Sequence, residues 1–262
     1  MYMGVYGRVV GFLLAKSKYE ALSRLEQNIG DGDKTYGTIH LFNKAYQLDV
    51  KINLKFKIEK APLLLANSSS TARLGQRYVI HVDVPVELES LDGKFNVKEE
   101  KVVEMVDYQD PDVETMVLML SQHGEKAVRY ALKALNTIGF SPEEYLVRLS
   151  DVKPTEIMEI FKKIGSVVRA HLSDVREVYV RSVDIYGPSV EKSTLFKEIV
   201  QEKHGRLKMV ILRSKVGNRD IAVIISERGS IYTYSNLSVI EMAETLLPIL
   251  KEFKKANLIK RK

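Results

Sequence analysis

The stretch Gln47–Ile58, with the sequence QLDVKINLKFKI, has an apolar residue at every second position. Side chains of a β-strand point alternately to the two faces of a sheet, so this pattern predicts a long strand with one buried and one solvated face. One-sided burial is typical of antiparallel sheets, because strands of doubly wound parallel sheets are covered on both faces and read as continuous apolar runs. The pattern therefore argues against the common nucleotide-binding α/β folds. The residues expected to face the core are Leu48, Val50, Ile52, Leu54, Phe56 and Ile58.

A second alternating strand is expected at Ile80–Leu88, with Pro85 inside it. Proline has no backbone N–H to donate, so we expect this strand to lie at a sheet edge or to carry a bulge there. Further strands are expected at 35–42 and 94–106. Residues 1–110 are therefore predicted to form an antiparallel α+β module.

The middle of the chain has a different pattern. Apolar residues from Val113 to Leu135 recur at helical spacing, which predicts one long amphipathic helix over 113–137. Ser141-Pro142 and Lys153-Pro154 are typical of helix starts, because proline is well tolerated at the first helical position. We expect a helical segment over residues 111–172.

Strand patterns return near Arg176. A strand at 178–185, a helix ending near Lys203, three short strands between 206 and 234, and a last helix at 238–256 give a β-α-β-β-β-α module over 173–262. The predicted fold class is therefore α+β, with antiparallel sheets in two α+β modules joined by a helical segment.

An alternative prediction concerns residues 1–138 alone. Their order of strand, helix, about five strands and long helix also fits a helix-grip or START-like cup, in which strands curl around a C-terminal helix. Such a cup would bind an apolar small ligand between sheet and helix. The lining side chains would be Phe56, Val84, Val117 and Leu120, which could equally fill an ordinary core.

The C-terminal third resembles a family of small domains. The residues that carry the resemblance are Asp184-Ile185-Tyr186-Gly187-Pro188, Gly205-Arg206-Leu207, the apolar strand 221–225 and Glu227-Arg228-Gly229-Ser230-Ile231-Tyr232. This pattern is similar to prokaryotic modules of the DUF4388 (PATAN) type and to related archaeal domains of unknown function. The resemblance implies a non-catalytic interaction or signalling module and transfers no site residue.

Composition excludes several classes of site. The 262 residues contain no cysteine, which rules out a disulfide framework, a thiolate metal site and a thiol nucleophile. The five histidines show no metal-ligand spacing, and no cofactor motif is present, so neither a metal nor a cofactor is expected. The chain also lacks tryptophan and is rich in Lys and Glu, as proteins from thermophiles often are. The apolar stretch near the start is too short for a signal sequence or a membrane span, which predicts a cytoplasmic protein without a membrane partner.

Positive charge is concentrated towards the C-terminus. Residues 176–262 contain 17 Lys/Arg and 10 Asp/Glu, whereas the whole chain carries a formal net charge of +6. Cations at the chain end could neutralise phosphates, and Tyr232 and Tyr234 could stack on bases. The candidate nucleic-acid-binding residues are Lys251, Lys254, Lys255, Lys260, Arg261 and Lys262.

A polar loop at Asn67–Arg77 is a candidate anion site. Hydroxyls, two guanidiniums and a glycine could hold a phosphate, but the P-loop pattern is missing, and a solvated hairpin loop is the alternative. The candidate ligands in this loop are Ser69, Ser70, Thr71, Arg73 and Arg77.

The sequence contains no hydrolase elbow and no carboxylate pair in an apolar setting, so it does not support catalysis. The leading prediction is a non-enzymatic protein-interaction or adaptor protein that binds a protein partner or a second copy of itself. The alternatives are an RNA-, DNA- or ribonucleoprotein-binding protein with a basic tail, and the apolar-ligand cup.

Overall fold

The structure is a computed structural model that describes residues 5–11, 15–43, 48–62, 74–90, 93–108, 116–147, 154–176, 180–216, 218–227, 230–233 and 237–261. Its first part contains β1 (Val5–Gly11), α1 (Ala15–Glu26), β2 (Lys34–Asn43), β3 (Leu48–Ala61), β4 (Leu74–Ser90), β5 (Gly93–Tyr108), β6 (Met116–Ser121), α2 (Gly124–Asn136) and β7 (Glu143–Val147). Its second part contains α3 (Pro154–Ile164), β8 (Ser166–Ser173), β9 (Ser182–Tyr186), the 3₁₀ turn η2 (Val190–Lys192), α4 (Thr194–Gln201), β10 (Arg206–Val216), β11 (Arg219–Ser226), β12 (Ser230–Thr233), α5 (Val239–Lys255) and β13 (Ile259–Arg261).

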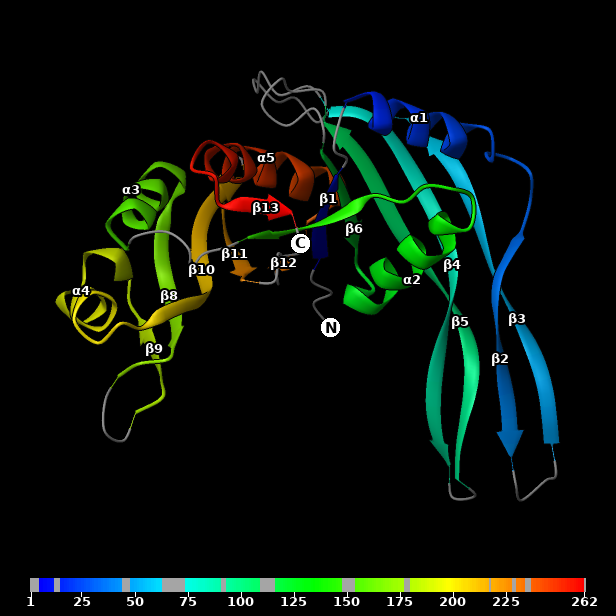
Figure 1. Cartoon of the computed structure of the whole chain (residues 1–262), viewed down its shortest axis with the longest axis horizontal. Coiled ribbons are helices and arrows are strands. Elements are labelled where there is room, and N and C mark those ends of the chain that lie inside the picture. Colours follow the sequence, from blue (N-terminus) through cyan, green and yellow to red (C-terminus); the bar gives the residue numbers. More distant parts are fainter. Residues whose placement is uncertain are drawn as a thin grey trace.

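One antiparallel sheet runs through the whole molecule, in the order β2-β3-β4-β5-β6-β1-β12-β11-β10-β8-β9 (Figure 1). Strand β1 joins its two halves, because Tyr6 lies opposite Ser121 of β6 on one side and opposite Tyr232 of β12 on the other. The prediction of two α+β modules joined by a helical segment is therefore wrong. The expected strand at Gln47–Ile58 does form, as β3.

The expected helical segment contains three strands. Residues 116–121, predicted as part of a helix, form β6, and all six of its side chains are buried. The physical reason is that β6 is covered on both faces, so its sequence MVLMLS is a continuous apolar run without the alternation that marks a strand covered on one face. Strands β7 and β8 also fall within this segment.

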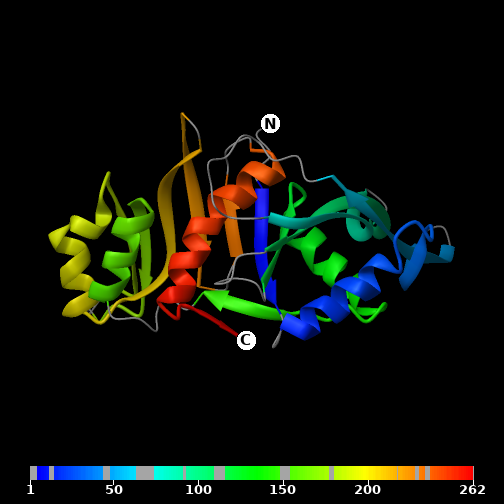
Figure 2. The same ribbon diagram turned by 90° about the horizontal axis from the view of Figure 1, so that it is seen from above.

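Two hydrophobic cores lie on opposite faces of the sheet, and β6 contributes to both. Val117 and Met119 belong to the core under α1 and α2, which we call the α2 face. Leu118 and Leu120 belong to the core under α3, α4 and α5, which we call the α5 face. Figure 2 shows α5 and α3 over one part of the sheet and α1 and α2 over the other. Away from the central strands, where α5 and α2 cover β6 on both faces, each half of the sheet has described helices on one side, and the sides are opposite.

The helix-grip alternative also requires correction. The strand order β2-β3-β4-β5-β6-β1 does not end at β1 but continues into β12, so the first half is not a separate cup. Phe56, Val84 and Val117 contribute to the same core as the side chains of α2. Leu120, the fourth expected lining residue, belongs to the core on the α5 face.

Strands β3 and β4 separate part of the way along. Their ladder ends at Phe56–Val82, whereas the β2–β3 and β4–β5 ladders continue to Asn43–Leu48 and Ser90–Gly93. Figure 1 shows the two hairpins extending beyond the rest of the sheet. Beyond this point Pro85 has a ladder partner on one side only, Lys98 of β5, which agrees with its expected position at an edge.

The basic C-terminal stretch is folded. Helix α5 begins with a capping box formed by Ser238 and Glu241. The side chain of Phe253, near the end of α5, is fully buried. Leu258 is also fully buried, and β13 then pairs with β7. None of the described helices has the length and apolar character that crossing a membrane requires.

Candidate functional site

The α2 face of the C-terminal half of the sheet is bare of described helices. Helices α3, α4 and α5 pack against alternate residues of β8 to β12, and these residues form a single core on the α5 face. The other residues of the same strands point to the α2 face, but α1 and α2 contribute to a core whose strand residues come from β1 to β6. Half-buried Met209 and Ile211 are examples of side chains on this bare face.

Five residues lie directly opposite one another across this face. Pairing places Tyr186 of β9 beside Arg169 of β8, Arg169 beside Ile211 of β10, and Ile211 beside Ile224 of β11. Ile224 is followed by Tyr232 of β12. Directly paired residues share a face, so the five form one continuous row, which we call the cross-strand row. Four strand spacings separate its two tyrosines, or roughly 19 Å.

The β9 end of the row is aromatic and charged. The Tyr186 side chain is 65% exposed. The Arg169 guanidinium lies over the Tyr186 ring, 4.8 Å from its centre. Arg169 Nε donates to Asp184 Oδ1 over 3.0 Å, and His171 Nδ1 lies 3.2 Å from Asp184 Oδ2. The hydrogen bond from Arg169, with a smaller one from His171, lowers the pKa of Asp184, so this carboxylate is ionised at neutral pH. Exposed Arg213 and Lys215 continue the same face along β10.

The opposite end of the row is more enclosed. Tyr232 is half-buried and packs edge-on against Tyr6, with ring centres 5.1 Å apart. Ile224, which lies next to Tyr232 in the row, is 6% exposed. The row therefore combines an exposed tyrosine, a guanidinium, an apolar centre and a partly covered second tyrosine.

The predicted basic tail lies elsewhere. Lys251 and Lys254 are half-buried on α5, and Lys255 pairs with Glu252 over 3.2 Å. Lys260 and Arg261 lie in β13, opposite Leu146 and Tyr145 of β7, and Lys262 falls outside the described residues. Since α5 covers the opposite face of the sheet, its lysines Lys251, Lys254 and Lys255 lie away from the cross-strand row.

Most of the predicted anion loop, including Ser69, Ser70, Thr71 and Arg73, falls outside the described residues. Arg77 lies on β4, where its Nε is 2.5 Å from Glu104 Oε2, and both side chains are mostly buried. This pair helps to line a pocket of about 340 Å³, together with Ser121, His123 and Ser238. Burial, aided by nearby Lys101, lowers the pKa of His123. Because Glu104 already compensates Arg77, this pocket offers no uncompensated positive charge for an anion.

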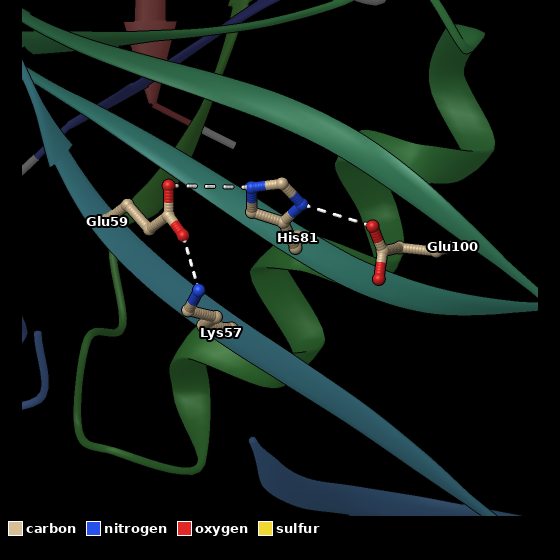
Figure 3. A network of polar contacts seen from close by, with 4 residues as sticks. All are labelled: Lys57, Glu59, His81 and Glu100. Carbon is tan, nitrogen blue, oxygen red and sulfur yellow. Dashed lines mark hydrogen bonds and ion pairs between the residues drawn. The ribbon is translucent and has the colours of Figure 1, made fainter. Parts of the chain in front are cut away.

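A separate polar network crosses the outer surface of β3, β4 and β5 (Figure 3). His81 Nδ1 lies 3.2 Å from Glu100 Oε1, and its Nε2 lies 3.9 Å from Glu59 Oε2. Glu59 also accepts a hydrogen bond from Lys57 Nζ, which lowers the pKa of Glu59. Within the described ranges, no cluster of three or more His, Asp or Glu side chains is arranged to hold a metal ion. Lys57 compensates Glu59, and the contacts are those of an ordinary surface polar network.

Sequence analysis identified Tyr232 but missed Tyr186 and Arg169. The available signal was the alternation in β9, where Ser182, Asp184 and Tyr186 point away from the core and Val183 and Ile185 point towards it. Tyr234, also expected to stack on bases, falls outside the described residues.

The resemblance to PATAN-type domains stays a prediction. No protein-family model matches the chain and no curated protein is detectably similar to it, so its function has to be inferred from the side chains described above.

Proposed function

We propose that this protein binds single-stranded nucleic acid on the bare α2 face of β8 to β12. The observation that supports this proposal is the cross-strand row, which places two tyrosines and an arginine on one open sheet face. Sheets that bind single-stranded RNA use aromatic side chains in this way, with two or three bases stacked on neighbouring strands. The proposal rests on this shared chemistry and on no relationship to a known family.

Stacking explains why the face would prefer single strands. Bases in a duplex are already stacked on one another, whereas unpaired bases can lie flat on an exposed ring such as Tyr186. Arg169 adds a second planar group that can stack or contact a phosphate. Half-buried Ile211 would contact base faces or sugars between the two tyrosines.

Charge supports the same face. Arg213 and Lys215 extend from it, and residues 176–262 have an excess of seven basic side chains. Phosphates bound there would release counterions, so binding should weaken as salt is raised. The cations of α5 and β13 would act at longer range, by attracting the strand without contacting bases.

Replacement of Tyr186 tests the proposal. We expect Tyr186→Ala to weaken binding of a fluorescently labelled single-stranded RNA by about tenfold or more, because one stacked base contributes about 1–3 kcal/mol. Fluorescence anisotropy at low and moderate salt measures the effect, with duplex DNA as the competing ligand. Tyr186→Phe should bind like the unchanged protein, since it keeps the ring.

The matched control is Tyr19→Ala, because Tyr19 is 67% exposed and lies on α1, away from the bare face. An equal loss of affinity in the Tyr19 and Tyr186 variants would point to a general effect of tyrosine removal. Absence of binding at low salt, or unchanged binding by Tyr186→Ala, would contradict the proposal.

Replacement of Asp184 is expected to strengthen nucleic-acid binding, whereas loss of the Tyr186 ring weakens it. Its carboxylate neutralises Arg169 and would repel a nearby phosphate. We expect Asp184→Asn to increase affinity for single-stranded RNA and to steepen the dependence of log Kd on log salt by about one, because Arg169 gains a phosphate contact. A salt titration of the variant and the unchanged protein measures both quantities. Weaker binding by Asp184→Asn would mean that Asp184 positions Arg169 for a contact with the base.

A protein-interaction role is the second candidate, and a different part of the molecule favours it. The projecting hairpins expose apolar side chains beyond both cores, such as Val50 at 44% and Leu88 at 41%. Exposed apolar groups on a projecting element are typical of contact surfaces.

A further inference from the structure

Where β3 and β4 separate, each loses its neighbour on one side. Residues 48–55 of β3 still pair with β2, and residues 83–90 of β4 still pair with β5. Within the described part of the chain, no strand pairs with the sides that face away from these partners. The separation therefore creates two strand edges, one on each hairpin.

The separation is stabilised by specific hydrogen bonds. Asp83, which is 8% exposed, accepts the backbone N–H of Lys55 at Oδ2 over 2.9 Å, and also accepts Lys98 Nζ over 2.9 Å. The Tyr36 hydroxyl donates to the backbone carbonyl of Asp83. These side chains replace the ladder hydrogen bonds that β3 and β4 would otherwise form with each other.

Only one of the two edges is blocked. On β4, Pro85 has no N–H to donate, and its carbonyl accepts a hydrogen bond from Lys126 Nζ of α2. On β3, residues 48–54 contain no proline, and Figure 1 shows this part of β3 along the outer flank of the molecule. The β3 edge is therefore the one that can add a strand.

The direction of the β3 backbone groups follows from Lys55. Its N–H points away from β2, as its bond to Asp83 shows. N–H and C=O groups of alternate residues point to the same side of a strand, so those of Asp49, Lys51 and Asn53 point outwards too. These three residues offer donors and acceptors to an added antiparallel strand.

The sequence of this edge is complementary to itself. If a second copy of β3 pairs in antiparallel orientation about a two-fold axis at Ile52, Asp49 lies opposite Lys55 of the other copy, and Lys51 lies opposite Asn53. The two Ile52 side chains then meet each other, with Val50 opposite Leu54 on the same face. This register joins Lys51 and Asn53 by hydrogen bonds twice and places the opposite charges of Asp49 and Lys55 across the axis twice, while the Lys55 N–H stays bonded to Asp83.

We propose that two copies of this protein associate through the β3 edge, in an antiparallel pair centred on Ile52. The contact extends the sheet from one molecule into the next and is symmetric, so it closes after two copies. It uses the projecting hairpin and leaves the cross-strand row accessible, so it is independent of the proposed nucleic-acid binding.

Engineered cysteines test the contact directly, because the chain has no cysteine of its own. Across an antiparallel pair without mutual hydrogen bonds, Cα atoms are about 4.5 Å apart, which suits a disulfide. We expect Ile52→Cys to form a disulfide-linked dimer under mild oxidation. The matched control is Val50→Cys, whose two cysteines would be about 14 Å apart in this register and should not cross-link. Cross-linking by Val50→Cys in place of Ile52→Cys would overturn the register, and cross-linking by neither would overturn the contact.

Charge reversal gives an independent test in solution. We expect Asp49→Lys and Lys55→Glu each to raise the dimer dissociation constant by about tenfold, since each places like charges opposite one another twice. An equimolar mixture of the two variants should form heterodimers, and the double variant should dimerise again. Analytical ultracentrifugation measures all four proteins, with Lys162→Glu on α3 as an unrelated charge-reversal control.

Both edge residues are well exposed, and their ion pairs, Asp49 with His40 and Lys55 with Asp33, are exposed too, so the variants should remain folded. Circular dichroism confirms this in each case. A protein that sediments as a monomer at every concentration would overturn the proposal, as would single variants that dimerise as well as the unchanged protein.

Discussion

Replacing Asp107 by alanine is expected to lower the free energy of unfolding by about 3–5 kcal/mol. Lys18 Nζ of α1 lies 2.7 Å from Asp107 Oδ1 at the end of β5, and the two side chains are only 3% and 6% exposed. Removal of the carboxylate takes away the charge partner that lies 2.7 Å from the Lys18 ammonium in a region closed to water, where the loss of charge compensation is costly. Guanidinium unfolding followed by circular dichroism measures the change.

Two further variants separate the loss of charge compensation from the loss of packing. The double variant Lys18→Met/Asp107→Leu should recover most of the lost stability, because it removes both buried charges at similar side-chain volume. Glu159→Ala, which breaks the exposed pair with Lys162 on α3, should cost less than about 1 kcal/mol. If Asp107→Ala lowered the free energy of unfolding by no more than Glu159→Ala does, the buried pair would not be required for stability.

Phe253→Ala is the second variant expected to have a large effect, a loss of about 3–5 kcal/mol. Phe253 of α5 is fully buried and packs edge-on against Phe161 of α3, with ring centres 6.4 Å apart. We also expect the whole chain to unfold in one transition, because β1 and β6 contribute side chains to the cores on both faces. Hydrogen exchange measured by mass spectrometry should show β3 to β5 losing protection together with β10 and β11.

The control for this prediction is Leu195→Ala, since Leu195 is 49% exposed on α4 and its removal should change stability little. If Phe253→Ala lowered protection only in β8 to β12, the two halves of the sheet would unfold separately. That result would mean that the pairing of β1 with β12 does not couple the two cores.

The sequence predicted the parts of the fold where one face of a strand is wet. Alternation in 47–58 and at 80–88 identified β3 and β4, because water on one side leaves a polar residue at every second position. It failed at 116–121, where α2 and α5 cover both faces and the alternation disappears. The position of β1 between β6 and β12 depends on pairing across more than a hundred residues, and no local pattern records such pairing.

The candidate site was predictable only in part. Tyr232 stood out as an aromatic residue on a late strand, but the partners that make it part of a row, Tyr186 and Arg169, lie on other strands, and their register follows from turns and bulges. The basic residues of 251–262 suggested a tail that binds nucleic acid, with its first part in the last helix. In the structure Lys251, Lys254 and Lys255 belong to α5, and Lys260 and Arg261 belong to β13. Phe253 and Leu258, which lie between them, are buried.

The central position of β1 has a consequence for synthesis of the chain. Tyr6 and Ser230, whose hydroxyls lie 3.3 Å apart, are 224 residues apart in the sequence. At about 5–20 residues per second, Tyr6 leaves the ribosome roughly 10–45 s before Ser230 does. During this interval residues 5–8 of β1 lack the partner strand β12, although β7 can already pair with Val10 and Gly11, so the nascent sheet carries an open edge at its future centre. Joining of the two halves is therefore a late step, and ribosome-associated chaperones that shield strand edges should increase the yield of folded protein.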